Sequence, residues 1–394
     1  MGVALVGTFF GPPTHSATAH GPSTSVAAIS TPSEELLRHA QFYAKDYNVT
    51  EVEALRRLGL MTAAEQYMTS MERTHPDRFA GAWIENTADT FAVHVRFTAG
   101  PEVLDPHTAL VAVGLPIEAT YTAETTLAKR IDLTNTANGE WIKALPEMVG
   151  LYPDVKSDDI VVVLSNGSRM TSAETEERLG LSNVRVEYAE GTVGDSNKGG
   201  LRMTSCTTGF TVINSSTLNK SVATAAHCAD SFQQYTKWEP SDGVYHTMNF
   251  RGQVRDANAD IAWYGTPAHE VRPRFYGAIR GGEGTEQTSW GAAGVGSHLC
   301  HQGKTTDYSC GDVTSVSYQP TYAGACPSTC NSSFVRVFGS NLKNLPGDSG
   351  GPWYRDSTIY GVHKGGQYNG SIPGQVAYYS KYLYLPTQQS LLTN

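Results

Sequence analysis

Cysteine is absent from the first 205 residues of this 394-residue chain, and all six cysteines lie between Cys206 and Cys330. An even, clustered set of cysteines indicates disulfide bonds and therefore an oxidising compartment. The spacings do not fit paired CxxC zinc ligands, and the sequence contains no HExxH motif, so we expect no metal and no other cofactor. The uneven distribution predicts two regions with different fates, of which only the second must survive outside the cell.

Charged residues are also scarce: they make up 17% of the chain, and none of the first 33 residues is Lys, Arg, Asp or Glu. Apolar residues 3–10, followed by Ala17-Thr18-Ala19, resemble the later part of a secretory signal peptide with its cleavage site. We therefore predict that residues 1–30 are a signal-peptide remnant or a disordered leader, and that the protein is secreted. The basic segment that begins such a peptide is missing, which suggests that the true start lies upstream of Met1.

Long apolar runs and basic clusters are missing as well. No segment after the leader reaches the ~18 apolar residues that a membrane span needs, so we expect no membrane partner. The net charge of −9, without a cluster of Lys and Arg, argues against a nucleic-acid partner. The length predicts two or three domains, and 39 glycines with few charges favour strands and turns over helical bundles.

Residues 31–190 have the pattern of a mixed α/β region. Residues 31–34 and 50–53 have the sequence of a capping box, and each predicts the start of a helix. The first helix should reach about Tyr47, and the second should reach Leu58 or, past Gly59, Met71. Apolar periodicity further predicts strands at 91–97, 160–164 and 184–188 and a helix at 171–179.

The sequence pattern changes at about Gly191. From there on, short β-rich runs alternate with turns rich in Gly, Ser, Asn and Thr, which is typical of a barrel or a sandwich. Roughly 200 residues suit two barrels of ordinary size. Residues 196–200 (Ser-Asn-Lys-Gly-Gly) are predicted to be an exposed, cleavable linker.

Three motifs in this second region carry chemistry. His227 lies in the run Thr-Ala-Ala-His-Cys, Asp260 leads into an apolar segment, and Ser349 lies in Gly-Asp-Ser-Gly-Gly-Pro. A serine hydroxyl needs a base within hydrogen-bond reach, and a buried carboxylate can orient that base. We therefore predict Ser349 as nucleophile, His227 as general base and then acid, and Asp260 as the orienting acid.

The same motif predicts an oxyanion hole formed by the backbone N–H groups of Gly347 and Ser349. Asp256 is the alternative acid, but Asp260 is favoured because it leads directly into an apolar run. The motif also fits the looser G-x-S-x-G pattern of α/β-hydrolases, in which the acid and the histidine follow the serine. Only 45 residues follow Ser349, which is too few for the rest of that fold.

At these residues the chain resembles the secreted bacterial chymotrypsin-like serine proteases of the α-lytic protease and streptogrisin group. Further matches are the segment Cys206-Thr207-Thr208-Gly209-Phe210, the loop from Cys300 to Cys310, and Pro346 before the nucleophile. The resemblance implies two six-stranded antiparallel β-barrels with a C-terminal helix, the first barrel at about 200–275 and the second at about 285–394. It implies a monomeric serine endopeptidase, spanning 191–394, that acts on polypeptides.

The same resemblance implies that residues 31–190 are a pro-region that assists folding, inhibits the enzyme in cis and is then removed. It also implies the disulfides Cys206–Cys228 and Cys300–Cys310. Cys326 and Cys330, four residues apart, could close a small loop or remain free thiols. A third disulfide common in the family is absent, since position 343 is Lys. The family's buried acid before the nucleophile is Asp348 here, and His301 occupies the place of its arginine partner.

The strand that lines the primary specificity pocket is matched by Gly-Val-His-Lys-Gly-Gly at 361–366. We predict that substrates contact four of these residues: His363, Lys364, Gly365 and Gly366. Glutamate-specific members have histidine at the position of His363, and a histidine can donate to a substrate carboxylate. The prediction is a preference for Glu at P1, and self-cleavage after Glu190 would agree with it. Broad apolar specificity is the alternative, as is a catalytically inactive relative that binds peptides.

Overall fold

The computed structural model describes residues 31–103, 110, 113–165, 167–189, 192–195, 203, 206–228, 233–235, 245–278 and 284–393. The leader, the residues around Glu190 and the linker at 196–200 lie outside the described residues. Among the described residues, no helix is sufficiently long and apolar to span a bilayer.

Two helices begin the described chain: α1 (Glu34–Tyr47) and α2 (Glu51–Thr74). Ser33, rather than Thr31, caps α1, because its hydroxyl accepts from the N–H of Leu36. Thr50 caps α2 in the same way, by accepting from the N–H of Glu53. The second helix continues through Gly59, as its longer predicted form requires, and buries one face against α1.

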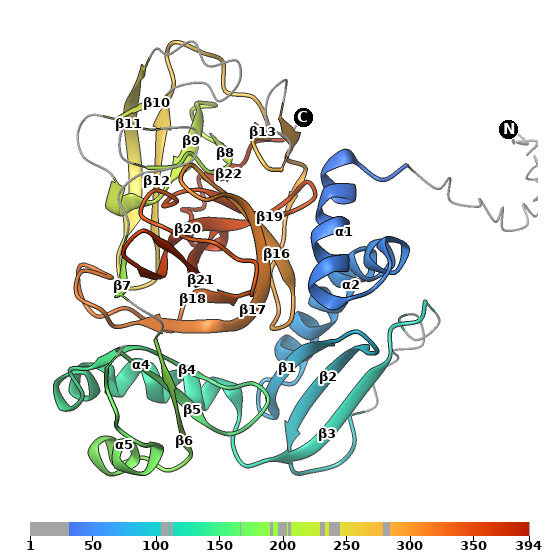
Figure 1. Ribbon diagram of the computed structural model, residues 1–394, viewed down its shortest axis with the longest axis vertical. Coiled ribbons are helices and arrows are strands. Elements are labelled where there is room, and N and C mark those ends of the chain that lie inside the picture. Colours follow the sequence, from blue (N-terminus) through green and yellow to red (C-terminus); the bar gives the residue numbers. More distant parts are fainter. Residues whose placement is uncertain are drawn as a thin grey trace, which may run out of the picture. The chain divides into compact units, whose positions relative to one another are not determined.

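Two small sheets follow in the α/β region (Figure 1). The first contains β1 (Phe79–Asn86), β2 (Phe91–Thr98) and β3 (Ile117–Ala123). After helix α4 (Leu127–Ala144) come β4 (Met148–Pro153), β5 (Ile160–Leu164), α5 (Ser172–Leu179) and β6 (Val184–Tyr188). The predicted strands at 91–97, 160–164 and 184–188 and the helix at 171–179 are confirmed, whereas β1, β3, α4 and β4 were not predicted.

The first of the two β-regions is a six-stranded sheet in the order β10-β11-β12-β9-β8-β22. Its strands are β8 (Thr211–Asn214), β9 (Lys220–Thr224), β10 (Gln233–Tyr235), β11 (His246–Arg255), β12 (Asp260–Gly265) and β22 (Gln389–Leu391). All pairs in it are antiparallel. Its last strand therefore comes from the far end of the chain.

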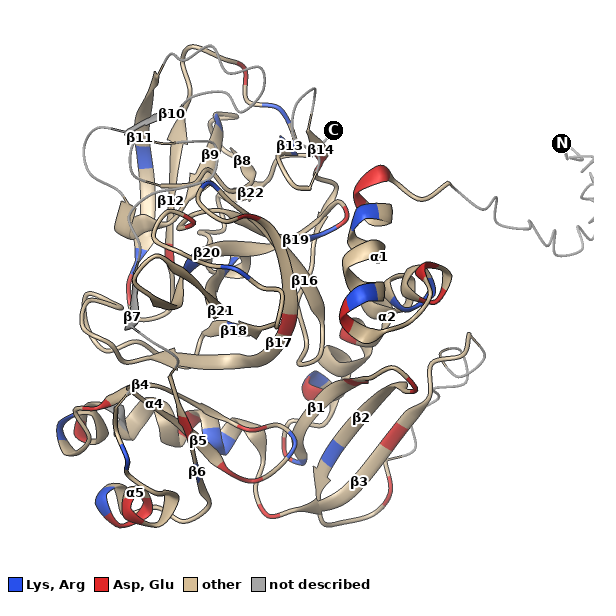
Figure 2. Ribbon diagram, viewed as in Figure 1, with Lys and Arg blue, Asp and Glu red and all other residues tan. Residues whose placement is uncertain are grey.

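The second β-region is a closed barrel, because its six strands run in the order β16-β19-β20-β21-β18-β17 and β16 also pairs with β17. These strands are β16 (His298–Gly303), β17 (Asp307–Pro320), β18 (Phe334–Phe338), β19 (Pro352–Arg355), β20 (Thr358–Asn369) and β21 (Ile372–Lys381). Few charged residues lie on these strands (Figure 2). The two predicted six-stranded regions are thus present.

The predicted C-terminal helix is wrong. The described residues there form a short 3-10 turn, η2 (Tyr382–Tyr384), followed by β22. Leu391 and Leu392 are buried in the cores of the first β-region, and Gln389–Leu391 pairs with β8. Burial of two leucines in a sheet outweighs the weak helical preference of this short segment.

The disulfides lie within the β-regions, whereas a shared sheet joins the second barrel to the α/β region. The three bonds connect Cys206 with Cys228, Cys300 with Cys310, and Cys326 with Cys330. The sheet β4-β5-β6 is continuous with the second barrel, since β17 pairs with β4 at Gln319↔Leu151 and Pro320↔Gly150.

Candidate active site

His227 is held by its own local structure. It lies in a 3-10 turn (Ala226–Cys228) directly after β9, and the disulfide from Cys228 to Cys206 fixes the end of that turn. Its ring Nδ1 lies 2.5 Å from Oδ2 of Asp260, and its backbone N–H donates to Oδ1 at 2.7 Å. One carboxylate therefore holds both the ring and the main chain of this histidine.

Asp260 is the first residue of β12 and is 2% exposed. Burial by itself would raise its pKa, but the charges of His227 and Lys364 and their hydrogen bonds lower the pKa of Asp260 overall. The carboxylate therefore stays ionised inside the protein. Asp256, the alternative acid, instead closes a local turn by accepting from the N–H groups of Asn258 and Ala259.

Ser349 lies in a tight turn that only glycine neighbours permit. Gly347 has φ +132° and Gly350 has φ +88°, and a Cβ on Gly350 would lie 2.2 Å from the carbonyl oxygen of Thr207. The Ser349 hydroxyl donates to the carbonyl oxygen of Lys364 at 3.2 Å, and the Ser349 carbonyl accepts from the N–H of Thr207 at 2.5 Å. The turn that carries the serine is thus fixed from both sides.

Asp348 is buried and well supplied with donors. Its carboxylate accepts from the backbone of Thr305, Thr306 and Leu345 and from the Thr306 hydroxyl, at 2.6–3.2 Å. Burial raises the pKa of Asp348, although the nearby His301 and these donors oppose the rise. A carboxylate with four donors does not need a cationic partner.

His301 is therefore not the ion-pair partner that the sequence suggested, since the structure gives no ion pair between these two described residues. Its Nε2 contacts the Lys343 carbonyl at 2.8 Å and the Ser309 hydroxyl at 2.9 Å. Burial lowers the pKa of His301 more than the charge of Asp348 raises it. The cause of the error is burial, which disfavours a charged imidazole at this position.

His363 lies on β20 in a stack of aromatic rings. The indole N–H of Trp353 donates to Nδ1 of His363 at 3.3 Å, so the proton of the neutral imidazole is on Nε2. This Nε2 is buried and has no hydrogen-bond partner among the described residues. Burial, together with His301 and His227, lowers the pKa of His363 well below its usual value. The ring of His301 stacks on that of His363, with 5.2 Å between centroids.

The glycines that follow are already paired with another part of the chain. Strand β7 (Thr192–Asp195) runs antiparallel to β20, with Asp195 opposite Gly365 and Gly194 opposite Gly366. Extended peptides add to exposed strand edges in this way, by backbone hydrogen bonds. A segment of the protein itself therefore pairs with the edge of β20 to which substrate was expected to bind.

Lys364 follows His363 on β20, at an irregularity in the pairing of β20 with β21 between His363 and Gly365. Its Nζ donates to Oδ2 of Asp260 at 2.9 Å, and it lies over the ring of Phe334 at 5.5 Å. The lysine is 1% exposed. Its ammonium, on a residue that was predicted to contact substrate, thus binds the predicted orienting acid.

Two buried glutamates were missed by the sequence reasoning. Glu35 on α1 accepts from the hydroxyls of Tyr354 and Thr285, and Glu65 on α2 forms two hydrogen bonds with Arg355 at 2.7 and 2.8 Å. Both side chains reach from the α/β region into the second β-region or its neighbouring loop. On the sequence they look like ordinary surface residues of helices, so no local signal could have identified them.

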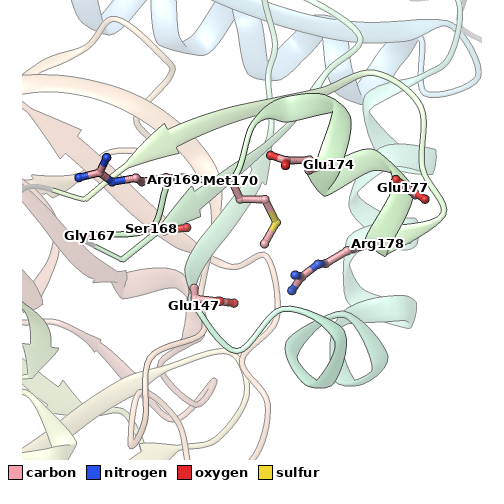
Figure 3. A pocket seen from close by; sticks show the side chains of 8 residues that line it. All are labelled: Glu147, Gly167, Ser168, Arg169, Met170, Glu174, Glu177 and Arg178. Atoms are coloured by element: carbon pink, nitrogen blue, oxygen red, sulfur yellow. The ribbon is translucent and has the colours of Figure 1, made fainter.

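A pocket in the α/β region contains none of the predicted site residues (Figure 3). It is lined by eight residues around α5: Glu147, Gly167, Ser168, Arg169, Met170, Glu174, Glu177 and Arg178. One of its acids, Glu174, is used locally, because it completes the capping box of α5 with Thr171.

The comparisons with known proteins agree with these motifs. The Trypsin family model matches residues 192–385. Serine protease 1 of Rarobacter faecitabidus is 24% identical over 348 residues, which cover 87% of this chain and 61% of that protein. Streptogrisin-C of Streptomyces griseus is 30% identical over 171 residues, which cover 43% of this chain and 34% of that protein. The chain thus spans less than two thirds of the length of either relative.

Among solved structures, Thermobifida fusca Protease A has 25% sequence identity and a TM-score of 0.38, over 52% of this chain and 98% of its own. The family match begins at the first residue of β7 and includes His227, Asp260 and Ser349. It confirms the resemblance inferred from the motifs: residues 192–385 of this chain are a trypsin-family domain.

Proposed function

We propose that this protein is a serine endopeptidase in which Ser349, His227 and Asp260 form the catalytic triad. The observation that carries the proposal is the buried carboxylate of Asp260, which bonds both the ring and the backbone of His227. Within a trypsin-family domain, this arrangement holds the imidazole in one orientation and stabilises its protonated form.

In the proposed mechanism, the Nδ1–H of His227 donates to Asp260, so Nε2 is the atom that accepts the proton of Ser349. The Ser349 oxygen then attacks the substrate carbonyl, and the oxyanion is stabilised by the N–H groups of Gly347 and Ser349. His227 returns the proton to the leaving amine, and water later hydrolyses the acyl-enzyme.

Labelling with an organophosphorus fluoride tests this mechanism. We expect the processed protein to be labelled at Ser349 and to hydrolyse peptides. Ser349→Ala should abolish both, whereas Ser357→Ala, a matched change in a turn of the same domain, should leave both intact. An inactive relative that only binds peptides would not react with the reagent.

We further propose a preference for Glu at P1, with His363 as the residue that selects it. The support is the neutral, buried ring whose Nε2–H has no partner among the described residues. A substrate carboxylate could accept this hydrogen bond, and an unmade hydrogen bond at a buried donor is costly. Profiling on a peptide library should show Glu at P1, and His363→Thr should reduce that preference at least tenfold. Apolar P1 residues in the profile of the wild-type enzyme would favour the alternative specificity.

We also propose that residues 31–190 are a pro-region, that the protein is secreted, and that it processes itself. Disulfides fit an oxidising compartment, and β7 on β20 would exclude substrate from the uncut chain. We place the cut after Glu190, which agrees with the proposed preference for Glu at P1 and lies just before the Trypsin family match that begins at Thr192.

N-terminal sequencing of the processed protein tests this position. We expect a sequence that starts at Gly191, and Glu190→Gln should slow processing. A mature N-terminus after Asp195 would contradict the proposed position. The matched control is Ser349→Ala, which should remain uncut.

A further inference from the structure

Lys364 shares one oxygen of the catalytic carboxylate with His227. Its Nζ lies 2.9 Å from Oδ2 of Asp260, and Nδ1 of His227 lies 2.5 Å from the same atom. The side chains of Asp260 and Lys364 are 3% and 1% exposed, so water screens this contact very little. A third charged group is thus built into a site for which the mechanism above needs only one acid and one base.

We propose that Lys364 is a positioning residue for the reaction: by sharing the Asp260 carboxylate with His227, its ammonium sets how strongly that carboxylate stabilises a charge on the histidine. This inference rests on the proposed triad. It assigns to the lysine side chain a role apart from the contact that its backbone makes with Ser349.

The effect of the lysine on His227 follows from the charges in the buried cluster. Without the lysine, a neutral His227 beside Asp260 gives a net charge of −1, and protonation of the ring neutralises the cluster. With an ammonium on Oδ2, the cluster is already neutral, and protonation of His227 leaves a net positive charge in a buried site. Like charges at close range disfavour protonation, so the histidine stays in its base form to lower pH.

The other groups that face this cluster do not change the direction of the expected shift in the protonation of His227. Asp260 makes a further contact through its backbone N–H, which donates to the neutral Ser380 hydroxyl at 3.1 Å. His363, which interacts electrostatically with His227, is kept neutral by burial, and burial likewise lowers the pKa of His301 behind it. The ring beside the ammonium is that of Phe334, which carries no charge. The lysine is therefore the cation that competes with His227 for this carboxylate.

The first experiment does not depend on activity. In the full-length chain carrying Ser349→Ala, the ring resonances of His227 are followed by NMR as a function of pH and assigned by loss of the signal in His227→Asn. Lys364→Met should move the midpoint upward by about one pH unit or more. Lys364→Arg, which keeps the charge, should move it much less. Lys220→Met removes an exposed lysine of the same domain and should leave the midpoint unchanged.

An unchanged midpoint in Lys364→Met would overturn the proposal, and so would an equal shift in Lys364→Arg. If the methionine variant does not fold, Lys364→Gln provides a second neutral side chain that can still donate to Asp260, and the same shift is expected for it.

The second experiment uses the processed enzyme and the pH dependence of kcat/KM on a peptide substrate. The acid limb should move to higher pH in Lys364→Met, in parallel with the NMR midpoint. A purely structural role would lower the rate at every pH without moving the limb, and this result would contradict the proposal. If the wild-type enzyme hydrolyses no peptide, the proposed function fails, while the NMR titration still decides the role of Lys364.

Discussion

The two regions of the chain are stabilised in different ways. Residues 206–393 contain three disulfides and a closed barrel, whereas the described residues from 31 to 189 contain no cysteine. The α/β region contacts the β-region through a shared sheet and through buried polar side chains such as Glu35 and Glu65. Disulfides thus cross-link the β-region, whereas only non-covalent contacts hold the folded α/β region against it.

This difference is consistent with the proposed removal of residues 31–190. Disulfides constrain the unfolded chain, and barrels with many non-local contacts fold slowly. In the proposed pro-region, an extra sheet and two buried carboxylates would give the β-region additional non-covalent partners during folding. Changes at Glu65, at the disulfide Cys206–Cys228 and at His39 test this contrast.

The largest effect on stability is expected from a change at Glu65, whose side chain connects α2 to the second barrel. Besides its two bonds to Arg355, its carboxylate accepts from the hydroxyls of Ser297 and Tyr360. Glu65→Gln would leave a buried arginine without its counter-charge, which typically costs about 3–5 kcal/mol. Chemical denaturation of the uncut Ser349→Ala chain should show this loss. The exposed Glu34→Gln on α1 is the control and should change stability by less than about 0.5 kcal/mol.

An intermediate effect is expected from the disulfide Cys206–Cys228, which closes 22 residues around the turn of His227. Replacing both cysteines by alanine should destabilise the β-region by about 3 kcal/mol. Activity should fall further than stability predicts, because the turn that carries His227 loses its anchor. If denaturation of the double variant instead affects only the α/β region, the contrast between the two regions is wrong.

The smallest effect on stability is expected when the pH is lowered, and it depends on His39. His39 on α1 is buried, neither ring nitrogen has a hydrogen-bond partner among the described residues, and its ring lies 5.2 Å from that of His298. Burial, followed by the charges of His298 and Arg355, lowers the pKa of His39 well below its usual 6.5. The unfolded chain therefore binds more protons than the folded chain below about pH 6.5, and stability falls as the pH is lowered through this range.

The slope from one such group approaches about 1.4 kcal/mol per pH unit. Denaturation of the uncut chain between pH 7 and pH 5 should show a weaker pH dependence in His39→Leu than in the wild type. An equal slope in both proteins would mean that His39 does not weaken the contact between α1 and β16 on acidification.

Local sequence signals predicted the elements that depend on neighbouring residues. The strand at Ile160–Leu164 follows from five consecutive apolar residues, and the cap at Thr50 follows from Thr50 and Glu53, three positions apart. The unpredicted helix α4 has a weak apolar pattern, with polar residues on much of its length. This helix packs against β4, which follows it directly, and against β1, which lies far earlier in the sequence.

In the candidate site, too, some features could be predicted from neighbouring residues and others could not. The order of His227, Asp260 and Ser349, with glycines around the serine, can be recognised in the sequence. The proposed nucleophilic catalysis needs those residue types and a tight turn at the serine. The choice of Asp260 over Asp256 was also accessible, since only Asp260 leads into a buried strand. The expected pairing of His301 with Asp348 was wrong, because Asp348 takes donors from Thr305, Thr306 and Leu345.

Neighbouring residues in the sequence were enough to identify the groups that could react and the starts of most helices and strands in the α/β region. The contacts of those groups depend on the folded structure. The contact of Lys364 with Asp260 spans 104 positions, and that of Glu65 with Arg355 spans 290. Such contacts depend on how strands and helices pack and on which polar groups lose water together. Neither property can be read from neighbouring residues, because burial is a consequence of the whole fold.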